Sequence, residues 1–163
     1  MKLLKTERCV LRSFQEEDFF DAKKLFVDQK VRRYLGGIRQ EDSIQAILDE
    51  MLHPRDDSYY WVIRETETGE FIGLISLDPH HDSNDIEISY QILPEWWGAG
   101  YATEVVQEMI DYAFNELNLS KIIAETQTAN LSSYKLLERV GMKFEKTVTR
   151  YGDEQAIYSI QSI

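Results

Sequence analysis

The sequence has few of the residues that define several classes of protein. Its single cysteine, Cys9, excludes an internal disulfide and any zinc site built on cysteines. The first residues lack the apolar run of a signal peptide. The longest apolar run lies within Phe71-Ile-Gly-Leu-Ile and is far shorter than the ~20 residues that span a bilayer. These absences predict a cytoplasmic protein that is not inserted in a membrane.

Positive charge is also scarce, and it is missing from the middle of the chain. Eighteen Lys and Arg residues stand against 29 Asp and Glu residues, which gives a formal charge of −11. Between Arg64 and Lys121 there is no Lys or Arg, whereas twelve acidic residues lie there. Because phosphate binding needs clustered Lys and Arg, this balance argues against a nucleic-acid partner and leaves a cationic partner open. The acidic stretch fits either a solvated surface or the wall of a cleft.

The hydrophobic patterns predict one α+β domain that covers residues 1–163. A chain of 163 residues matches the ~100–200 residues of a typical domain. Apolar and alternating runs predict about seven strands, near residues 8–13, 59–65, 71–77, 85–92, 121–126, 142–150 and 154–161. Helical spacing predicts about four flanking helices, near residues 16–26, 44–51, 103–117 and 132–140. The two strands on either side of the long third helix should form one parallel pair in a mixed sheet.

The segment from Leu93 to Thr103, between a strand and the long helix, carries the main chemical signal. Gly98 and Gly100 allow a tight turn and a close approach of the backbone to a ligand. The helix that follows offers unpaired N–H groups and a partial positive charge to an anion. The loop lacks the Gly-Lys-Ser/Thr ending of a Walker A motif and the third glycine of a dinucleotide fingerprint. It therefore predicts a phosphate-binding loop, although a simple turn into a helix gives the same pattern.

Three motifs follow one another along nearly the whole chain. They are Thr6-Glu-Arg-x-x-Leu-Arg, Trp97-Gly-x-Gly-Tyr-Ala-Thr-Glu, and Asn130-x-x-Ser133 with Gly141 eight residues further on. With the order of elements, they resemble the GNAT superfamily of acyl-CoA-dependent N-acetyltransferases. The likeness is greatest to the ribosomal-protein N-terminal alanine acetyltransferase branch, which is often termed Rim-like. The resemblance implies a single GNAT-like domain that uses acetyl-CoA as co-substrate and needs no metal.

The resemblance also implies which residues hold coenzyme A. Backbone N–H groups of the loop would bind the pyrophosphate, from Gly98, Ala99, Gly100, Tyr101, Ala102 and Thr103. Ile92 and Leu93 would pair with the pantetheine arm and direct an N–H group at the thioester carbonyl, and Asn130 would orient the arm.

Two loop positions depart from the family pattern. Glu95 stands where the family usually has Gln or Arg, and Ala99 stands where a basic residue is frequent. The loop itself therefore supplies no cation to the phosphates. Lys135 and Arg139 are the nearest candidate partners for the remaining phosphate, and ordinary surface charge explains them equally well.

Acetyl transfer to an amine needs a neutral nucleophile, a polarised carbonyl and a proton for the leaving thiolate. A lysine-like amine with a pKa near 10.4 is only ~0.04% neutral at pH 7, so a general base assists the reaction. Glu87 resembles the strand carboxylate that many GNAT relatives use, either directly or through water. A surface carboxylate beside Asp85 is the simpler interpretation. The backbone N–H near Ile92 would stabilise the oxyanion.

Ser133 matches the serine of the Rim-like branch and is the expected proton donor to the thiolate. Tyr134 is the reserve candidate, because Leu137 occupies the position at which other GNAT branches have a tyrosine. Ser133 also fits a purely structural role at the start of a helix. His80 and His81 are adjacent and have no further ligand set, so we expect no metal site there.

The sequence therefore predicts an N-acetyltransferase that moves acetyl directly from acetyl-CoA to a cationic primary amine. The acceptor is either a protein N-terminal α-amine or a small polyamine or aminoglycoside-like amine. A non-catalytic acyl-CoA-binding protein and a generic nucleotide-binding module are the competing hypotheses. Relatives often pair, so a homodimer remains open.

Overall fold

One mixed β-sheet runs through the structure, a computed structural model that describes residues 3–163. Its eight strands are β1 (Leu4–Lys5), β2 (Cys9–Ser13), β3 (Tyr59–Glu65), β4 (Phe71–Pro79), β5 (Ile86–Ile92), β6 (Lys121–Gln127), β7 (Lys143–Arg150) and β8 (Asp153–Gln161). They lie in the order β1-β2-β3-β4-β5-β6-β8-β7. Only β5 and β6 are parallel neighbours among these strands, which confirms the mixed sheet with one parallel pair.

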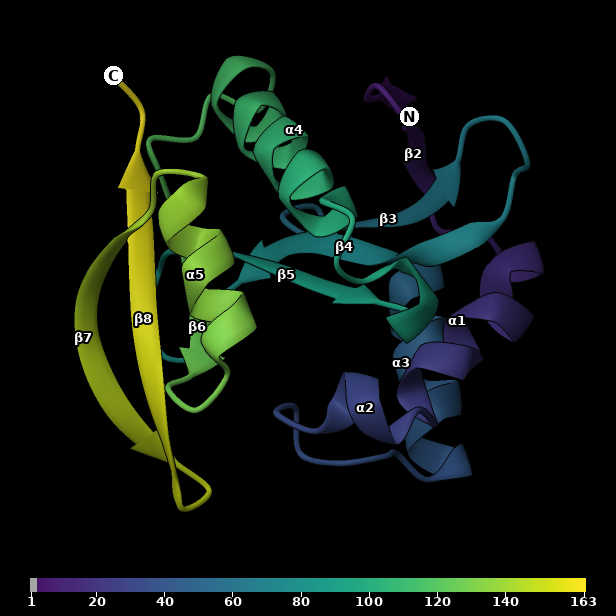
Figure 1. Cartoon of the computed structure of the whole chain (residues 1–163), viewed down its shortest axis with the longest axis horizontal. Helices are drawn as coiled ribbons and strands as arrows, with labels where there is room; N and C mark the ends of the chain where they lie inside the picture. The colour runs from purple at the N-terminus through teal and green to yellow at the C-terminus, as the bar shows by residue number, and fades with distance from the viewer. Residues whose placement is uncertain (1–2) are drawn as a thin grey trace.

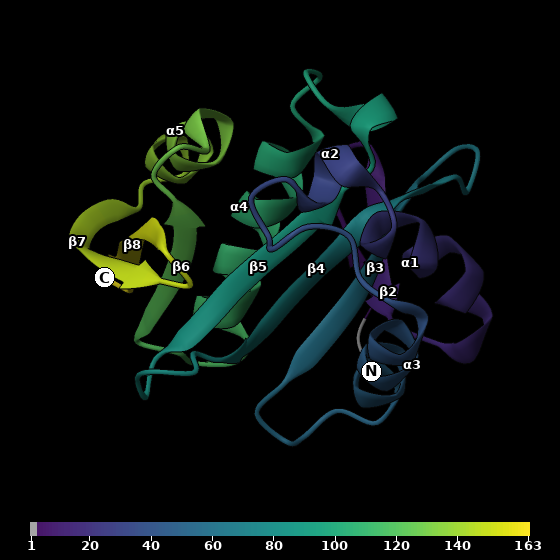
Figure 2. The same cartoon turned by 90° about the horizontal axis from the view of Figure 1, so that it is seen from below.

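Helices cover both faces of the sheet. Those in the described part of the chain are α1 (Phe19–Phe26), α2 (Gln29–Arg32), α3 (Glu41–Leu52), α4 (Tyr101–Asn115) and α5 (Leu131–Arg139). Figure 1 shows α4 and α5 on one side of the strands and α1, α2 and α3 on the other. The view from below in Figure 2 has α1, α2 and α3 in front of the strands and α4 behind them. None of the helices within residues 3–163 has the length and apolar character needed to cross a bilayer.

The structure has more elements than the sequence predicts, eight strands instead of about seven and five α-helices instead of about four. The additional elements, β1 and α2, have two and four residues, which is too short for an apolar period to show. Asp28 caps α2 by accepting the N–H groups of Lys30 and Val31. The long helix also begins at Tyr101 rather than Thr103, because Gly100 with a φ of +83° is its N-cap.

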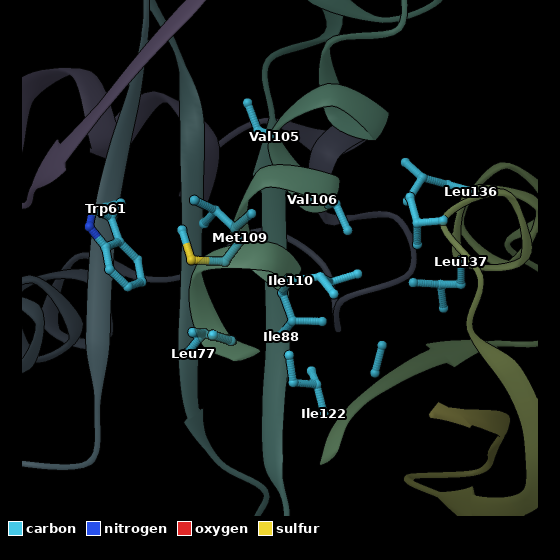
Figure 3. Packing of buried hydrophobic residues seen from close by; sticks show 14 of the residues in the cluster. Trp61, Leu77, Ile88, Val105, Val106, Met109, Ile110, Ile122, Leu136 and Leu137 are labelled. Atoms are coloured by element: carbon cyan, nitrogen blue, oxygen red, sulfur yellow. The ribbon is translucent and has the colours of Figure 1, made fainter. Parts of the chain in front are cut away.

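The main core lies between α4 and the sheet (Figure 3). The buried side chains that meet there come from α4 (Val105, Val106, Met109 and Ile110) and from the strands (Trp61, Leu77, Ile88 and Ile122). Burying one such aliphatic side chain contributes about 1.5–3 kcal/mol to the free energy of folding. Because α4 packs against β5 through several of them, the packing fixes the position of the helix relative to the strand.

The parallel pair is short, and this positions the site. β5 and β6 pair only at Ile86 with Ile122 and at Glu87 with Ile123, although each strand has seven residues. β5 stays paired with β4 along its whole length, whereas β6 stays paired with β8. The two strands therefore part after Glu87, and the second half of β5 has no strand on that side.

We expect Gly73→Ala to destabilise the protein by about 1–3 kcal/mol, because overpacking displaces the backbone. A Cβ atom at Gly73 would overlap the Gln91 carbonyl oxygen and lie 3.0 Å from the Ile92 Cα atom. Urea denaturation measures the change in the free energy of unfolding. Glu70→Ala, at an exposed position just before β4, is the control and should stay within about 0.5 kcal/mol of wild type. Equal stability of the Gly73→Ala variant and wild type would contradict this close approach of β4 to β5.

Candidate active site

The carboxyl end of β5 directs backbone groups to the side that β6 has left. The Leu93 N–H donates to the Ile72 carbonyl of β4 at 2.9 Å. Because backbone groups of an antiparallel strand alternate between its two sides, those of Ile92 point away from β4. The Ile92 carbonyl accepts the indole N–H of Trp97 at 2.8 Å. Of the two residues expected to pair with pantetheine, Ile92 faces the open side, while the Leu93 N–H belongs to the sheet.

The loop after β5 is shaped to place the start of α4 beside a ligand. Gly98 and Gly100 have φ values of +78° and +83°, a region that favours glycine. Ala99 lies between them, and Ala102 and Thr103 lie in the first turn of α4. The first N–H groups of a helix have no partner within it, so they are available to an anion.

The side chains of Trp96 and Tyr101 attach this loop to the sheet. The Trp96 indole N–H donates to the Phe71 carbonyl of β4 at 3.1 Å. Its ring also packs edge-on against the Tyr101 ring, with the centroids 5.3 Å apart. Both contacts tie the loop to the sheet, so packing under the loop is the role that these two rings have in the structure.

Glu104, in the second sequence motif, makes hydrogen bonds to Thr6 and Arg8 of the first motif. Its carboxylate accepts the Thr6 hydroxyl at 2.5 Å, the Arg8 backbone N–H at 2.9 Å and the Arg8 Nε–H at 2.8 Å. Burial alone would raise the pKa of Glu104, yet the hydrogen bonds from Thr6 and Arg8 lower the pKa overall. The Arg8 guanidinium also lies 3.9 Å from the centre of the Tyr101 ring. These contacts hold a cation beside the glycine loop.

A second cation reaches the loop from α5. The Arg139 guanidinium donates to the Thr103 hydroxyl at 3.0 Å. Lys135, one turn earlier on the same helix, is exposed. The guanidiniums of Arg8 and Arg139 therefore both contact the first turn of α4, and both residues come from outside the stretch that has no Lys or Arg.

Glu87 is the last residue of β5 that pairs with β6, opposite Ile123 on β6 and Asp78 on β4. Burial is the main cause of a raised pKa at Glu87, which reaches about 7. The charge of His80 opposes this rise, while the carboxylates of Asp78 and Glu125 add to it. The Glu125 backbone N–H donates to the Glu87 carboxylate, which places that carboxylate where the strands part. A carboxylate with this pKa is suited to general-base catalysis near neutral pH.

A polar contact crosses from α5 to β5. The Asn130 side chain caps α5 by accepting the Ser133 N–H at 3.3 Å. The Ser133 hydroxyl lies 3.2 Å from the Tyr90 hydroxyl on β5. Burial raises the pKa of Tyr90 against the opposing effect of Ser133, so the phenol keeps its proton at neutral pH. Tyr134 instead packs against the main core.

His80, just before β5, belongs to a polar network with Glu125 and Arg150. His80 Nε2 lies 2.7 Å from one oxygen of Glu125, and Arg150 donates to the other at 2.6 Å. The remaining His80 nitrogen lies 3.1 Å from the Ser83 hydroxyl. Ligand atoms of His80, His81 and Glu125 do lie within 4.8 Å of one another. Because Arg150 already supplies a positive charge to Glu125, this arrangement favours an ion pair over a metal ion.

A cavity of about 200 Å³ lies on the opposite face, between the sheet and α1, α2 and α3. Its strand wall includes Ser76 of β4 and Ser89, Tyr90 and Gln91 of β5. Because residues alternate along a strand, Glu87 shares a face with Ser89 and Gln91. The cavity therefore reaches β5 just beyond Glu87.

A family model described as Acetyltransferase (GNAT) domain matches residues 8–143 of the chain. The chain belongs to the GNAT acetyltransferase family. The matched range contains Glu87, the glycine loop and Ser133. Several relatives that align with most of the chain are N-acetyltransferases of this family, so the protein is an enzyme of that class.

The comparisons with individual GNAT proteins show the fold and leave the acceptor undetermined. The uncharacterised N-acetyltransferase YoaA of Bacillus subtilis is 32% identical over 154 residues, 91% of this chain and 87% of that protein. A spermidine N-acetyltransferase from Vibrio cholerae, solved with CoA and spermine, superposes with a TM-score of 0.80 at 20% identity, covering 94% and 95% of the two chains. The ribosomal-protein-S5-alanine acetyltransferase from Vibrio fischeri gives 0.77 at 18% identity, covering 99% and 97%.

Two parts of this GNAT site were not predicted from the sequence. Tyr90 alternates with Ile88 and Ile92 and therefore gave the signal of a core residue. Arg8 lies 96 residues from Glu104, so only the shared presence of two motifs hinted that they meet. A polar group within an otherwise apolar strand face is the signal that identifies Tyr90.

We expect Glu104→Ala to lower the free energy of unfolding by about 1–3 kcal/mol, because it leaves the donors on Thr6 and Arg8 without their acceptor. The affinity for coenzyme A should fall as well, since the start of α4 loses its anchor. Denaturation and calorimetry with coenzyme A measure the two effects. Gln107→Ala, at an exposed position one turn further along α4, is the control and should change neither. Unchanged affinity for coenzyme A in the Glu104→Ala variant would show that this anchor does not shape the loop.

Proposed function

We propose that the protein transfers the acetyl group of acetyl-CoA directly to a primary amine within a ternary complex. The observation that carries the proposal is the position of Glu87, a carboxylate with a raised pKa at the point where β5 and β6 part. Further along β5 are an open strand backbone and then a glycine loop at a helix start, and a cavity lies on the face of the sheet that Glu87 shares.

In this proposal coenzyme A binds on the side of α4 and α5. Its pyrophosphate accepts N–H groups from the loop between Gly98 and Thr103, with Arg8 and Arg139 close by. Lys135 is exposed near Arg139 and is a further phosphate partner. The pantetheine arm lies between the diverging strands, where the Ile92 backbone faces it and Asn130 orients it.

The chemistry then follows from the groups at the junction. Glu87 accepts a proton from the acceptor ammonium, directly or through water, and the free amine attacks the thioester carbon. The Ile92 N–H stabilises the oxyanion of the tetrahedral intermediate. When the intermediate collapses, the C–S bond breaks, the nitrogen releases its second proton to water, and the Ser133 hydroxyl gives its proton to the thiolate. Tyr90 lies 3.2 Å from Ser133, returns a proton to it and regains its own proton from water.

Two classes of amine are proposed as acceptors. The fold is shared with a ribosomal-protein-S5-alanine acetyltransferase, which supports a protein N-terminal α-amine and the Rim-like branch. A spermidine N-acetyltransferase is 26% identical over 129 residues, which supports a small cationic amine. Either acceptor is present in the cytoplasm, which remains the proposed location.

The pH profile of wild type should show a limb in which kcat/KM rises through pH 7, because the base acts in its deprotonated form. Glu87→Gln should lower kcat/KM by about 10²–10⁴ and remove that limb, which leaves only the ionisation of the amine. Release of free coenzyme A thiol measures both. Asp85→Asn is the matched control, since Asp85 lies two residues earlier and pairs with Lys121 at 3.5 Å. An unchanged profile in the Glu87→Gln variant would assign the base to another group.

We expect Ser133→Ala to lower kcat about tenfold or more with little effect on the KM for acetyl-CoA. The thiolate then has to take its proton from solvent. Steady-state kinetics of this variant are compared with those of Tyr134→Phe. A tenfold loss in the Tyr134→Phe variant alone would move the acid role to Tyr134.

The alternative, an acyl-CoA-binding protein without catalytic activity, predicts a different result. A protein that only senses acyl-CoA binds acetyl-CoA tightly in calorimetry and releases no thiol when peptides or small amines are added. Release that depends on an added amine supports the transferase.

A further inference from the structure

Two arginines without acidic partners line the cavity between the sheet and α1, α2 and α3. Arg32 ends α2, and Arg39 lies in the segment before α3. In the part of the chain that the structure describes, no ion pair joins either guanidinium to an Asp or Glu side chain. Arg32 is only 5% exposed, and a buried charge is normally paired.

The contacts of Arg32 leave part of its guanidinium available. It donates to the Gly37 carbonyl at 2.9 Å and to the Leu35 carbonyl at 2.5 Å. A guanidinium has five N–H donors, so further donors remain. Burial and the positive charge of Arg39 lower the pKa of Arg32 to about 10, and the group stays charged at neutral pH. The cavity lining therefore includes a charged guanidinium with hydrogen-bond donors to spare.

The strand wall of the same cavity carries a hydrogen-bond acceptor without a donor, the reverse of the free donors on Arg32. Gln91 lines it, and its amide oxygen is buried with no hydrogen-bond partner among residues 3–163. An amide oxygen only accepts, so a ligand N–H group would satisfy it. Glu50 also lines the cavity, so its lining carries a carboxylate as well as the two guanidiniums.

Much of the remaining lining is apolar, and the space is small. Apolar lining comes from Phe26, Ile47, Met51 and Leu74. A volume of about 200 Å³ is below the ~300–1,000 Å³ of pockets that hold drug-sized ligands. The ligand that fits is therefore a small molecule or a single residue.

We propose that the acceptor carries a carboxylate in addition to its amine, as an apolar amino acid does. The carboxylate binds Arg32 and Arg39, and the amine lies at Gln91, on the same face of β5 as Glu87. Because four strand residues span ~13 Å, Glu87 accepts the proton of this amine through water. Guanidinium and carboxylate suit each other because they form paired, charge-assisted hydrogen bonds. A polyamine would instead bring a second ammonium against two guanidiniums that have no acidic partner. The inference rests on the proposed function and narrows its acceptor to one class.

Matched acceptors test this inference in the full-length protein with acetyl-CoA. The first pair is L-leucine and L-leucinamide, and the second is 6-aminohexanoate and 6-aminohexanamide, with 1,6-diaminohexane as the dication of the same chain. Values of kcat/KM are corrected for the neutral fraction of each amine. The acid should exceed its amide by about tenfold or more in at least one pair, which is the effect of a hydrogen bond to a charged group.

Arginine variants test the site itself. Arg39→Gln should raise the KM for the preferred acid about tenfold, with little change in kcat, and leave the amide unaffected. Arg39→Lys should restore part of the preference. Arg33→Gln is the matched control, because Arg33 is exposed, stacks on Tyr34 and is absent from the cavity lining. Because Arg32 is buried, the kinetics of Arg32→Gln are interpreted only if its thermal unfolding matches that of wild type. If it does not, the result for Arg39→Gln alone tests the site.

The outcomes separate this inference from the proposed function. Equal turnover of acid and amide in both pairs, or a faster reaction of 1,6-diaminohexane, overturns the inference and leaves the transferase in place. Absence of thiol release with every amine overturns the proposed function. In that case, calorimetry of the same acid and amide pairs on the coenzyme A-bound protein still tests whether the cavity binds a carboxylate. Tighter binding of the acid supports the carboxylate site, and equal binding of acid and amide overturns it.

Discussion

The early loss of pairing between β5 and β6 is the constraint on which the rest of the site depends. Two neighbouring strands normally satisfy each other's N–H and C=O groups along their whole length. Here the pairing ends at Glu87, so the Ile92 backbone faces a gap that no strand of this sheet fills. α4 packs against β5 and α5 packs against β6, so each of the two strands is held in place by a different helix. The contact between Tyr90 and Ser133 joins the two halves without closing the gap.

The sheet also separates charge. On the side of α4, the stretch without Lys or Arg receives its cations from outside, from Arg8 and Arg139. On the other face, Asp78 and Glu87 are neighbours, and each carboxylate makes it harder for another to ionise. The acidic composition of the chain is therefore not only a solvated surface, because Asp78 and Glu125 add to the rise in the pKa of the proposed base that burial causes.

Periodicity was sufficient for the elements that bury an apolar stripe over several turns or pairs. The helix after the glycine loop and the alternation of β5 were predictable, because both depend on local side-chain spacing. β1 and α2 were not, since two and four residues carry no period. Within the site, Glu87 and Ser133 were named from motifs. Their geometry needed the fold, because the partners of each side chain come from elements distant in sequence.

The unpaired arginines of the cavity bear on reactivity as well as on binding. A carboxylate close to an amine stabilises the ammonium and so reduces the neutral fraction that attacks the thioester. Guanidiniums at Arg32 and Arg39 would neutralise that carboxylate in the bound acceptor, which lowers the pKa of its amine toward the range in which Glu87 accepts a proton. An acceptor held in this way presents its amine to β5 in one orientation. Recognition of the anionic end and activation of the amine are then two effects of the same charges.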